Sequence, residues 1–378
     1  MKFKTLKANE YCDSVRDGTH DSPKKVEKGY KLITSKNIKE YGLDLQNASN
    51  ISKKDYDKVN ERSLVEKNDI LYSMIGTIGL IHRVNYEPNY AIKNIGLFKI
   101  KDEQKSKWLY YYLKTPKMKN YINSLLAGST QQYITLNNLR ELPIQIPEIT
   151  SDTNKIIYIL DLIETKITNN THTNNNLLEF GDLIFNNFFN LSSIKWDVKT
   201  LKEISTNFDF KRKPLSSRER EEHKGIYPYY GAASIIDYVD DYLFDDTYIL
   251  MGEDGTVITA DNKPVLQYIW GKFWTNNHAH VLQGKNVSNE YLYFALRNTN
   301  VKSLVTGAVQ PKINQENMNK LKFIIPDQDN LKILEENLSV LMKKYKNNCY
   351  KISKLEQIRD TLLPKLMNGE IDLNKVEI

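Results

Sequence analysis

The chain has very little cysteine and no long apolar run, and both shortages narrow the possible classes of protein. Its 378 residues include two cysteines, Cys12 and Cys349, 337 positions apart. Two such distant thiols make neither a disulfide framework nor a four-ligand zinc site, so a reducing compartment is expected. No apolar run approaches the roughly 18 residues of a membrane span, and the opening MKFKTLKANEYCD lacks the apolar core of a signal peptide. These features favour a folded, cytoplasmic protein over a secreted or membrane protein.

The sequence also lacks the common motifs of methyl-transfer and nucleotide chemistry. No Pro-Pro dipeptide occurs, so the Asn/Asp-Pro-Pro-aromatic loop of adenine methyltransferases is missing, as are G-x-G-x-x-G and G-x-x-x-x-G-K-[ST]. The nearest nuclease-like set, Asp161 with Glu164 and Lys166, falls in a predicted helix, where a solvated face is expected. His278 and His280 have no evident third metal ligand. The sequence therefore predicts no catalytic site and no bound metal or cofactor.

Charge is spread unevenly along the chain. The total is 53 Lys and Arg against 47 Asp and Glu, a net of +6, but residues 1–153 alone carry 25 against 18. Residues 199–330 are nearly neutral, with 16 against 17, although they hold a basic run at 211–220 and an acidic run at 237–246. Such runs are commonly solvated faces. The chain is mildly basic overall, and its net positive charge is lower than that expected of a compact domain that coats nucleic acid.

The most informative feature is an internal repeat. KTLK at 4–7 returns at 199–202, an offset of 195. ILYSMIGTIG (70–79) aligns with ILMGEDGTVI (249–258) at offset 179, and GSTQQYITLNNLRELPIQIPE (128–148) aligns without gaps with GAVQPKINQENMNKLKFIIPD (307–327) at the same offset. An ordered series of matches with small shifts indicates one duplicated unit with loop insertions. Each copy is expected to be α+β, with short β-type runs and one short amphipathic helix.

Each copy is followed by a predicted long helix with a heptad seam. Apolar residues recur there at alternating steps of four and three, which is typical of a coiled coil. The seam positions are Ile156, Ile163, Asn170 and Leu177 in the first helix and Leu334, Leu341, Asn348 and Leu355 in the second.

Neither seam can be buried alone, so we expect the two helices to pack together as an antiparallel pair. Each would be about 30 to 35 residues long, and the pair would space the two copies. Asn170 and Asn348 occupy matching seam positions, where an amide can fix the register. An ordinary core helix that tolerates one amide is the alternative.

The ordered motifs resemble those of one known family along nearly the whole chain. VRDGTHDSPK (15–24), NDILYSMIGTIG (68–79), GSTQQYITLNNLRELPIQIP (128–147), GAVQPKINQENMNKLKFIIP (307–326) and LEQIRDTLLPKLMNGEI (355–371) are similar to the specificity (DNA-recognition) subunit of type I restriction–modification enzymes. The resemblance implies two similar α+β target-recognition domains, separated by two long antiparallel coiled-coil helices, with an internal pseudo-twofold repeat. It implies domains at 1–150 and 195–328 and conserved helical regions at 151–194 and 329–378.

The resemblance also implies a function and partners. Each domain would recognise one half of a bipartite, asymmetric site in double-stranded DNA. The helical regions would set the spacing and dock two methyltransferase (modification) subunits, and restriction (motor–nuclease) subunits would join them. S-adenosylmethionine, ATP and Mg would be bound by those partners and not by this chain, which would be non-catalytic.

Polar and basic residues near the repeated motifs are the candidate DNA contacts. Forked amides and guanidinium groups recognise base edges, and clustered Lys and Arg hold phosphates. The candidates in the first copy are Thr19, His20, Lys24, Lys25, Lys31, Ser73, Thr77, Ser129, Thr130, Gln131, Gln132 and Tyr133. Those in the second copy are Lys211, Arg212, Lys213, Thr256, Asn277, His278, Gln310, Lys312 and Asn314. For each, a solvated surface or an ordinary turn is the alternative.

Two other classes of function stay open on the residues alone. One is a coiled-coil adaptor whose end domains bind protein, and the other is a stand-alone DNA-modifying enzyme with an unrecognised site. A steep loss of DNA affinity with added salt would exclude the adaptor. Methyl transfer by the purified chain alone would favour the enzyme.

Overall fold

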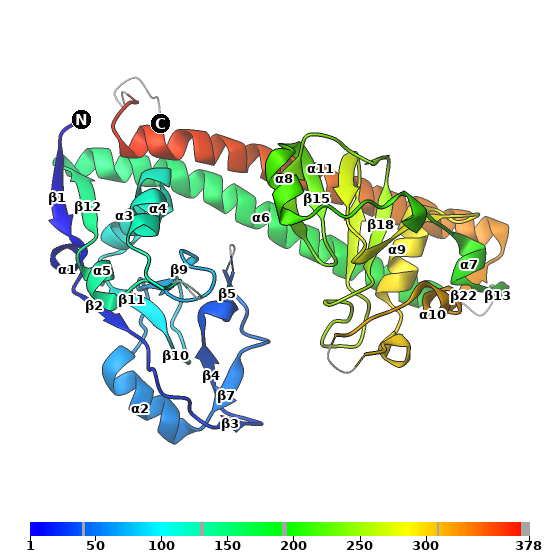
Figure 1. Cartoon of the computed structure of the whole chain (residues 1–378), viewed down its shortest axis with the longest axis horizontal. Coiled ribbons are helices and arrows are strands. Elements are labelled where there is room, and N and C mark those ends of the chain that lie inside the picture. The colour runs from blue at the N-terminus through cyan, green and yellow to red at the C-terminus, as the bar shows by residue number, and fades with distance from the viewer. Residues whose placement is uncertain (40–41, 129–131, 191–194, 308–309, 372–378) are drawn as a thin grey trace. The chain divides into compact units, whose positions relative to one another are not determined.

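The chain folds into two compact units, each built on one copy of the repeat. The structure, a computed structural model, describes residues 1–39, 42–128, 132–190, 195–307 and 310–371. The first unit comprises residues 1–170 together with the segment from 351 onward, and the second comprises residues 171–350. Both contain parts of the long helices α6 (Thr150–Phe188) and α11 (Gln328–Met367) (Figure 1). Along the described residues, no helix has an apolar stretch that would span a bilayer.

The first unit contains a two-stranded ribbon, two four-stranded sheets and a small hairpin. In sheet order, its strands are β1 (Phe3–Lys7) and β12 (Pro143–Pro147); β2 (Ser14–Asp17), β11 (Ile95–Lys99), β8 (Ile70–Ser73) and β9 (Ile81–Arg83); β10 (Tyr90–Ile92), β4 (Tyr30–Ile33), β7 (Ser49–Ile51) and β3 (Lys25–Val26); and β5 (Ile38–Lys39) and β6 (Gly42–Leu43). Its shorter helices are α1 (Ala8–Tyr11), α2 (Lys53–Ser63), α3 (Glu103–Lys114), α4 (Pro116–Ser124) and α5 (Leu136–Arg140), with a 3₁₀ turn at Ser35–Asn37.

The second unit repeats this plan. In sheet order, its strands are β13 (Trp196–Thr200) and β22 (Lys322–Pro326); β14 (Ser205–Asn207), β21 (Ala279–Gly284), β18 (Tyr248–Gly252) and β19 (Leu266–Ile269); and β16 (Ile235–Val239), β15 (Lys224–Tyr230), β20 (Lys272–Thr275) and β17 (Phe244–Asp245). Its shorter helices are α7 (Leu201–Ile204), α8 (Ser217–Glu222), α9 (Asn289–Arg297) and α10 (Gln315–Asn319), with 3₁₀ turns at Asp209–Lys211 and Lys302–Leu304.

Strand pairing confirms the duplication and corrects one of its offsets. β10 pairs in parallel with β4, and β20 pairs in parallel with β15, in otherwise antiparallel sheets. Lys7 pairs with Pro143 in the first ribbon, and Thr200 pairs with Lys322 in the second. The second strands of the two ribbons, β12 and β22, are 179 residues apart in the sequence. Lys7 therefore corresponds to Thr200, which is an offset of 193, and the offset of 195 taken from KTLK is wrong. The second KTLK crosses the junction of β13 with α7, whereas the first lies within β1.

A short amphipathic helix fills the core of each unit. In the first, α3 is capped by Asp102, which accepts a hydrogen bond from the Lys105 amide at 2.8 Å, and Trp108 is fully buried among strands and helices. In the second, Ser288 caps α9 in the same way, and Tyr291 and Phe294 are fully buried. Capping satisfies an orphan amide at the start of each helix, and the apolar face drives its burial.

The long helices run antiparallel, as predicted. In the first unit Glu164 of α6 bonds Arg359 of α11 at 3.4 Å, and in the second unit Asn174 bonds Asn348 at 3.0 Å. The residue numbers of the contacting positions therefore increase along α6 as they decrease along α11, so the two helices run in opposite directions. The helices have 39 and 40 residues, or about 60 Å each, and are longer than the expected 30 to 35. α11 continues through Pro364 and ends before Gly369, whose φ of 72° suits a residue that follows a helix.

The buried amide on α6 is Asn174 and not the predicted Asn170. Asn348 is buried, but Asn170 is half-buried and donates to the Lys166 carbonyl of its own helix. Asn174 is buried, accepts from the Asn348 amide, and donates to the Tyr345 carbonyl at 3.4 Å and the Cys349 sulfur at 3.2 Å. The partner of Asn348 therefore comes from the neighbouring heptad row.

Among the other predicted seam positions, Ile156, Ile163 and Leu334 are buried, while Leu177, Leu341 and Leu355 are half-buried. The predicted domain limits at 150/151, 194/195 and 328/329 stay predictions.

Candidate nucleic-acid interface

Two repeated loops meet in the first unit. The Gly-Thr turn after β8 and the loop before α5 are joined where Ile75 bridges Tyr133, and the Ile134 amide donates to the Met74 carbonyl at 3.0 Å. Gly76 and Gly128 have φ of 79° and 94°, which favour glycine, so the backbone turns tightly in both loops.

The second unit brings the same two loops together. Asp254 bridges Lys312, and the Ile313 amide donates to the Glu253 carbonyl at 2.9 Å. Gly255 and Gly307 have φ of 83° and 85°. Every one of these positions lies 179 residues after its counterpart, so the backbone arrangement is duplicated while the side chains differ.

A third loop, which follows β2, joins this cluster in the first unit. The Gly18 amide donates to the Ile95 carbonyl, the Thr19 amide donates to the Ile92 carbonyl, and the Thr19 carbonyl accepts from the Asn94 amide. His20 lies 2.9 Å from Asn94 Oδ1 and 2.9 Å from Asp17, a buried carboxylate that Arg62 also binds. The family-like DGTH segment is therefore fixed beside the ends of β10 and β11.

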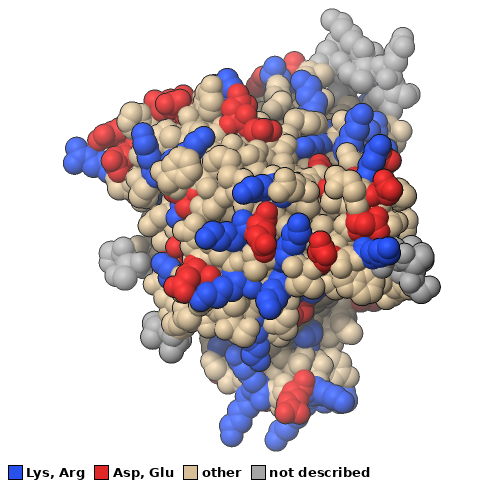
Figure 2. Space-filling view, turned by 90° about the vertical axis from the view of Figure 1, so that its right-hand side faces the viewer, with Lys and Arg blue, Asp and Glu red and all other residues tan. Residues whose placement is uncertain are grey.

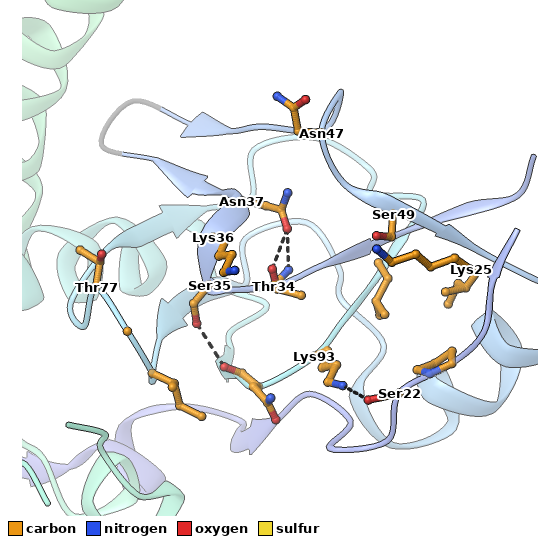
Figure 3. Close-up of a pocket in the computed structure, with 16 residues that line it drawn as sticks. Ser22, Lys25, Thr34, Ser35, Lys36, Asn37, Asn47, Ser49, Thr77 and Lys93 are labelled. Atoms are coloured by element: carbon orange, nitrogen blue, oxygen red, sulfur yellow. Dashed lines mark hydrogen bonds between the residues drawn. The ribbon is translucent and has the colours of Figure 1, made fainter. Parts of the chain in front are cut away.

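A cavity of about 640 Å³ opens among these loops (Figure 3). Its polar lining comes from the third loop with the start of β3, the turn after β4, the start of β7 and the segment before it, the Gly-Thr turn and the segment after β10. Lys25, Lys36 and Lys93 surround it, and Lys93 donates to the Ser22 hydroxyl. None of its lining residues that the structure describes is acidic, and no described carboxylate forms an ion pair with these three lysines. Unneutralised ammonium groups beside hydroxyls and amides suit a phosphate-bearing, hydrogen-bonding ligand.

The corresponding region of the second unit is built on ion pairs. Arg212 bonds Glu253 at 2.6 Å and lies 3.4 Å from Asp209, and Lys312 lies 3.4 Å from Glu253. His280 is buried with Asp209 2.6 Å from Nδ1 and the Ile313 carbonyl 2.9 Å from Nε2. Burial acts to raise the pKa of Asp209, but the hydrogen bond and charge of His280, together with hydrogen bonds from Asn207 and Val281, outweigh it and hold that pKa below its usual value. The network ties three loops to the sheet.

Asp209, Glu253 and His280 have the residue types and spacing of a metal site, with ligand atoms within 4.8 Å of one another. Both ring nitrogens of His280, however, already have hydrogen-bond partners. Arg212 supplies the positive charge between the two carboxylates. The arrangement fits a structural ion-pair network better than a metal centre.

The structure places most of the predicted contact residues on or near these loops. The exposed ones are His20, Lys24, Lys25, Thr77, Gln132, Tyr133, Lys211, Lys213, Thr256, Asn277, Gln310 and Lys312. Thr19 and His278 are half-buried at the loop ends. Ser129, Thr130 and Gln131 lie outside the described residues.

Four predicted contacts are instead engaged within the protein. Ser73 is buried, donates to the Thr77 carbonyl and accepts from the Leu80 amide, both at 2.7 Å, so it shapes the Gly-Thr turn. Lys31 donates to the Ala48 carbonyl, Arg212 belongs to the ion-pair network, and Asn314 caps α10 by accepting from the Asn317 amide. These side chains help to position the loops, and a direct contact of each with DNA stays a prediction.

Three residues of these loops were not predicted from the sequence: Lys36, Lys93 and Phe210. The two lysines follow β4 and β10, and only the parallel pairing of those strands brings them to one cavity. Phe210 is 77% exposed between Asp209 and Lys211. Its position next to a basic run was the feature of the sequence that could have identified it as a candidate contact. Net charge does not by itself locate a nucleic-acid interface, because basic and acidic side chains are interspersed on the face drawn in Figure 2.

These features define a duplicated α+β architecture: the two units share one frame of strands and loops, differ in the side chains of those loops, and both contain parts of two paired long helices. Comparison with known families agrees: the family described as "Type I restriction modification DNA specificity domain" matches residues 3–179 and 193–357. The chain belongs to this family.

The individual relatives are only distantly similar to this chain in sequence. The specificity subunit of the type I restriction enzyme MjaIX from Methanocaldococcus jannaschii is 24% identical over 389 residues, 93% of this chain and 84% of that protein. A protein of Haemophilus influenzae assigned as a type I specificity subunit is 35% identical over 136 residues, which span only 34% of its length. The crystal structure of a type I S subunit from M. genitalium matches with a TM-score of 0.53 at 18% identity, over 97% of this chain and 96% of that one. That likeness concerns the fold alone.

Proposed function

We propose that this chain is the non-catalytic DNA-recognition subunit of a type I restriction–modification complex, and that it recognises a bipartite, asymmetric site. The duplicated loop cluster carries the proposal. Backbone positions agree at a constant offset, yet the first cluster surrounds an acid-free cavity with three lysines and the second is built on ion pairs. Two similar frames with different side chains suit two different half-sites.

We propose that α6 and α11 dock the methyltransferase partners. Each unit leaves large apolar side chains of α6 exposed, namely Tyr158 and Leu162 in the first and Phe180 and Leu183 in the second. Their spacing of three or four residues puts each pair on one helix face. S-adenosylmethionine, ATP and Mg would belong to the methyltransferase and restriction subunits.

The test is co-expression with a type I methyltransferase subunit of the same host, followed by methylation mapping of the host DNA with long reads. The expected result is one motif of two defined halves around a spacer of fixed length. Methylation by this chain without the partner would contradict the non-catalytic role. Equal affinity of the purified chain for the mapped duplex and for random duplex would contradict sequence recognition.

Single-residue changes would separate the two domains. Gln310→Ala should relax the second domain's half-site only, at a cost of about 1–3 kcal/mol if the amide contacts a base in bidentate fashion. Gln131→Ala should do the same for the other half-site. Relaxation of both half-sites by either change would contradict one domain per half-site.

A further inference from the structure

Phe210 is an exposed aromatic ring held in a fixed place. It lies in the 3₁₀ turn after β14, and its side chain is 77% exposed. The ring stacks on Phe208 with centroids 6.3 Å apart and planes at 29°. Phe208 in turn packs edge-on against Tyr248, whose ring lies in the buried cluster with Phe244 and Phe273. Phe210 is therefore the outer end of an aromatic row anchored in the core.

Positive charge accompanies this ring. The Lys211 ammonium lies 6.0 Å from the Phe210 centroid and 5.2 Å from that of Phe208, and Lys213 is exposed two residues further on. Over the described part of the chain, neither lysine forms an ion pair with a carboxylate. An apolar face flanked by free ammonium groups is complementary to a nucleobase flanked by phosphates.

The turn that carries Phe210 is fixed to the loop cluster of the second domain. Arg212 donates to the Ala279 carbonyl at 2.8 Å and to Glu253, beside the Gly-Thr turn. On the other side, Trp274 Nε1 donates to the Lys213 carbonyl at 2.6 Å. The ring thus belongs to the same candidate interface as Thr256 and Lys312.

The first domain has no equivalent of this ring. Val15 pairs with Phe98, which pairs with Ile70, and in the second domain Asn207 pairs with Leu282, which pairs with Ile249. Because Ile70 and Ile249 match at offset 179, the counterpart of Phe210 is Gly18, three residues after Val15. A Cβ atom at Gly18 would lie 2.5 Å from the Ile92 carbonyl oxygen, so that position cannot accept a side chain without a shift of the backbone. An aromatic contact from this turn is therefore possible in the second domain alone.

We propose that Phe210 stacks on a nucleobase in the half-site bound by the second domain, while Lys211 and Lys213 hold the adjacent phosphates. This inference rests on the proposed DNA-recognition function. An aromatic wedge stacks on any base, so it would add affinity and local distortion of the duplex without recognising a particular base.

The test compares variants of the full chain on a duplex that carries the two mapped half-sites, by fluorescence anisotropy at several salt concentrations. Phe210→Ala should weaken binding about 5- to 100-fold without changing the slope of log Kd against log salt, because no phosphate contact is lost. Phe210→Trp should keep most of the affinity. Lys213→Ala should lower the slope by about 0.9.

Ile226→Ala is the matched control, because Ile226 is equally exposed, at 79%, on β15. It should bind within about twofold of the wild type. A 2-aminopurine placed in the second domain's half-site should brighten on binding of the wild type and less with Phe210→Ala.

Two results would distinguish failure of the stacking proposal from failure of the recognition function. If the wild type prefers the mapped duplex and Phe210→Ala binds it equally well, the stacking proposal is overturned and the recognition function stands. If the wild type shows no preference for the mapped duplex, the recognition function fails and the stacking proposal fails with it.

Discussion

At the scale of single residues, the cavity of the first domain concentrates charge without neutralising it. Lys25, Lys36 and Lys93 line it, and none of them has an acidic partner among the described residues. If each ammonium group contacts a DNA phosphate, each replacement removes one counterion-release contact.

We therefore expect Lys36→Ala and Lys93→Ala to weaken binding to specific and random duplexes alike. Each should lower the slope of log Kd against log salt by about 0.9, measured by titration at several salt concentrations. Lys4→Ala, an exposed lysine of β1 away from the cavity, is the control and should leave the slope unchanged. Unchanged slopes for both cavity lysines would place the DNA elsewhere.

Asp209 makes the stability of the second domain sensitive to acid. Its pKa in the folded chain lies below the ordinary value of 3.8, because hydrogen bonds and the charge of His280 outweigh burial. A lowered folded-state pKa stabilises the fold above the unfolded value, and this stabilisation is lost as the pH falls below 3.8.

Asp209→Asn should therefore lose less stability than the wild type as the pH falls from neutral through 3.8 and below, although it starts from a lower stability. Urea midpoints across that range measure the difference. Asp245→Asn removes an exposed carboxylate of β17 and should follow the wild-type curve. Parallel curves for Asp209→Asn and the wild type would show that this carboxylate does not carry the acid sensitivity.

The sequence could predict which residue types gather near the repeated motifs, but not the direction of their side chains. Ser73 and Thr77 belong to one motif, yet Ser73 is buried and Thr77 is exposed, because β8 is covered on both faces. Lys36 and Lys93 are 57 positions apart and meet only through the pairing of β4 with β10. Contacts made by non-local strand pairing leave no local pattern in the sequence.

At the scale of elements, a pair of buried amides joins α6 to α11. Asn348 donates to Asn174 at 3.0 Å, and both side chains are buried. Removing Asn348 leaves the buried Oδ1 of Asn174 without this hydrogen bond, whereas replacing both by apolar residues removes that penalty.

We expect Asn348→Leu alone to lower the free energy of unfolding by about 1–3 kcal/mol, and Asn174→Leu with Asn348→Leu to restore part of the loss. Urea denaturation of both single variants and the double variant gives the coupling energy. Asn170→Leu, at a half-buried position, should have a much smaller effect. Additive losses in the double variant would show that the two amides do not act as a pair.

The heptad pattern predicted two long antiparallel helices, but it did not identify the buried face at each turn. Two adjacent rows of α6 carry an asparagine, Asn170 and Asn174, and a straight α-helix drifts relative to a strict seven-residue repeat. Packing against α11 buries the second of them. KTLK misled for a related reason, since the same four residues lie in a strand in one copy and across a strand–helix junction in the other.

At the scale of the whole molecule, the paired helices are the element through which the spacing of the two half-sites would be set. Inserting seven residues into α6 after Asn170 and seven into α11 before Lys351 adds two turns to both and keeps their registers matched. We expect the non-specific spacer of the recognised site to lengthen by about three base pairs, since about 10 Å of helix corresponds to that rise of DNA.

Methylation mapping of a host that carries the lengthened chain would measure the new spacer. Insertion into α6 alone should break the pairing with α11 and abolish methylation. A functional double insertion with the original spacer would show that the helices do not set the spacing.

The way the chain divides has a consequence for its synthesis. The second unit is one continuous segment, whereas the core of the first unit contains both Tyr11 and Trp108 from early in the chain and Leu363 and Leu366 from the last turns of α11. A ribosome thus makes most of the first domain first, yet that domain cannot close its core until the second has been made. Until α11 has been made, the apolar side chains of the first unit that pack with Leu363 and Leu366 lack that cover, so its core is the last to be completed.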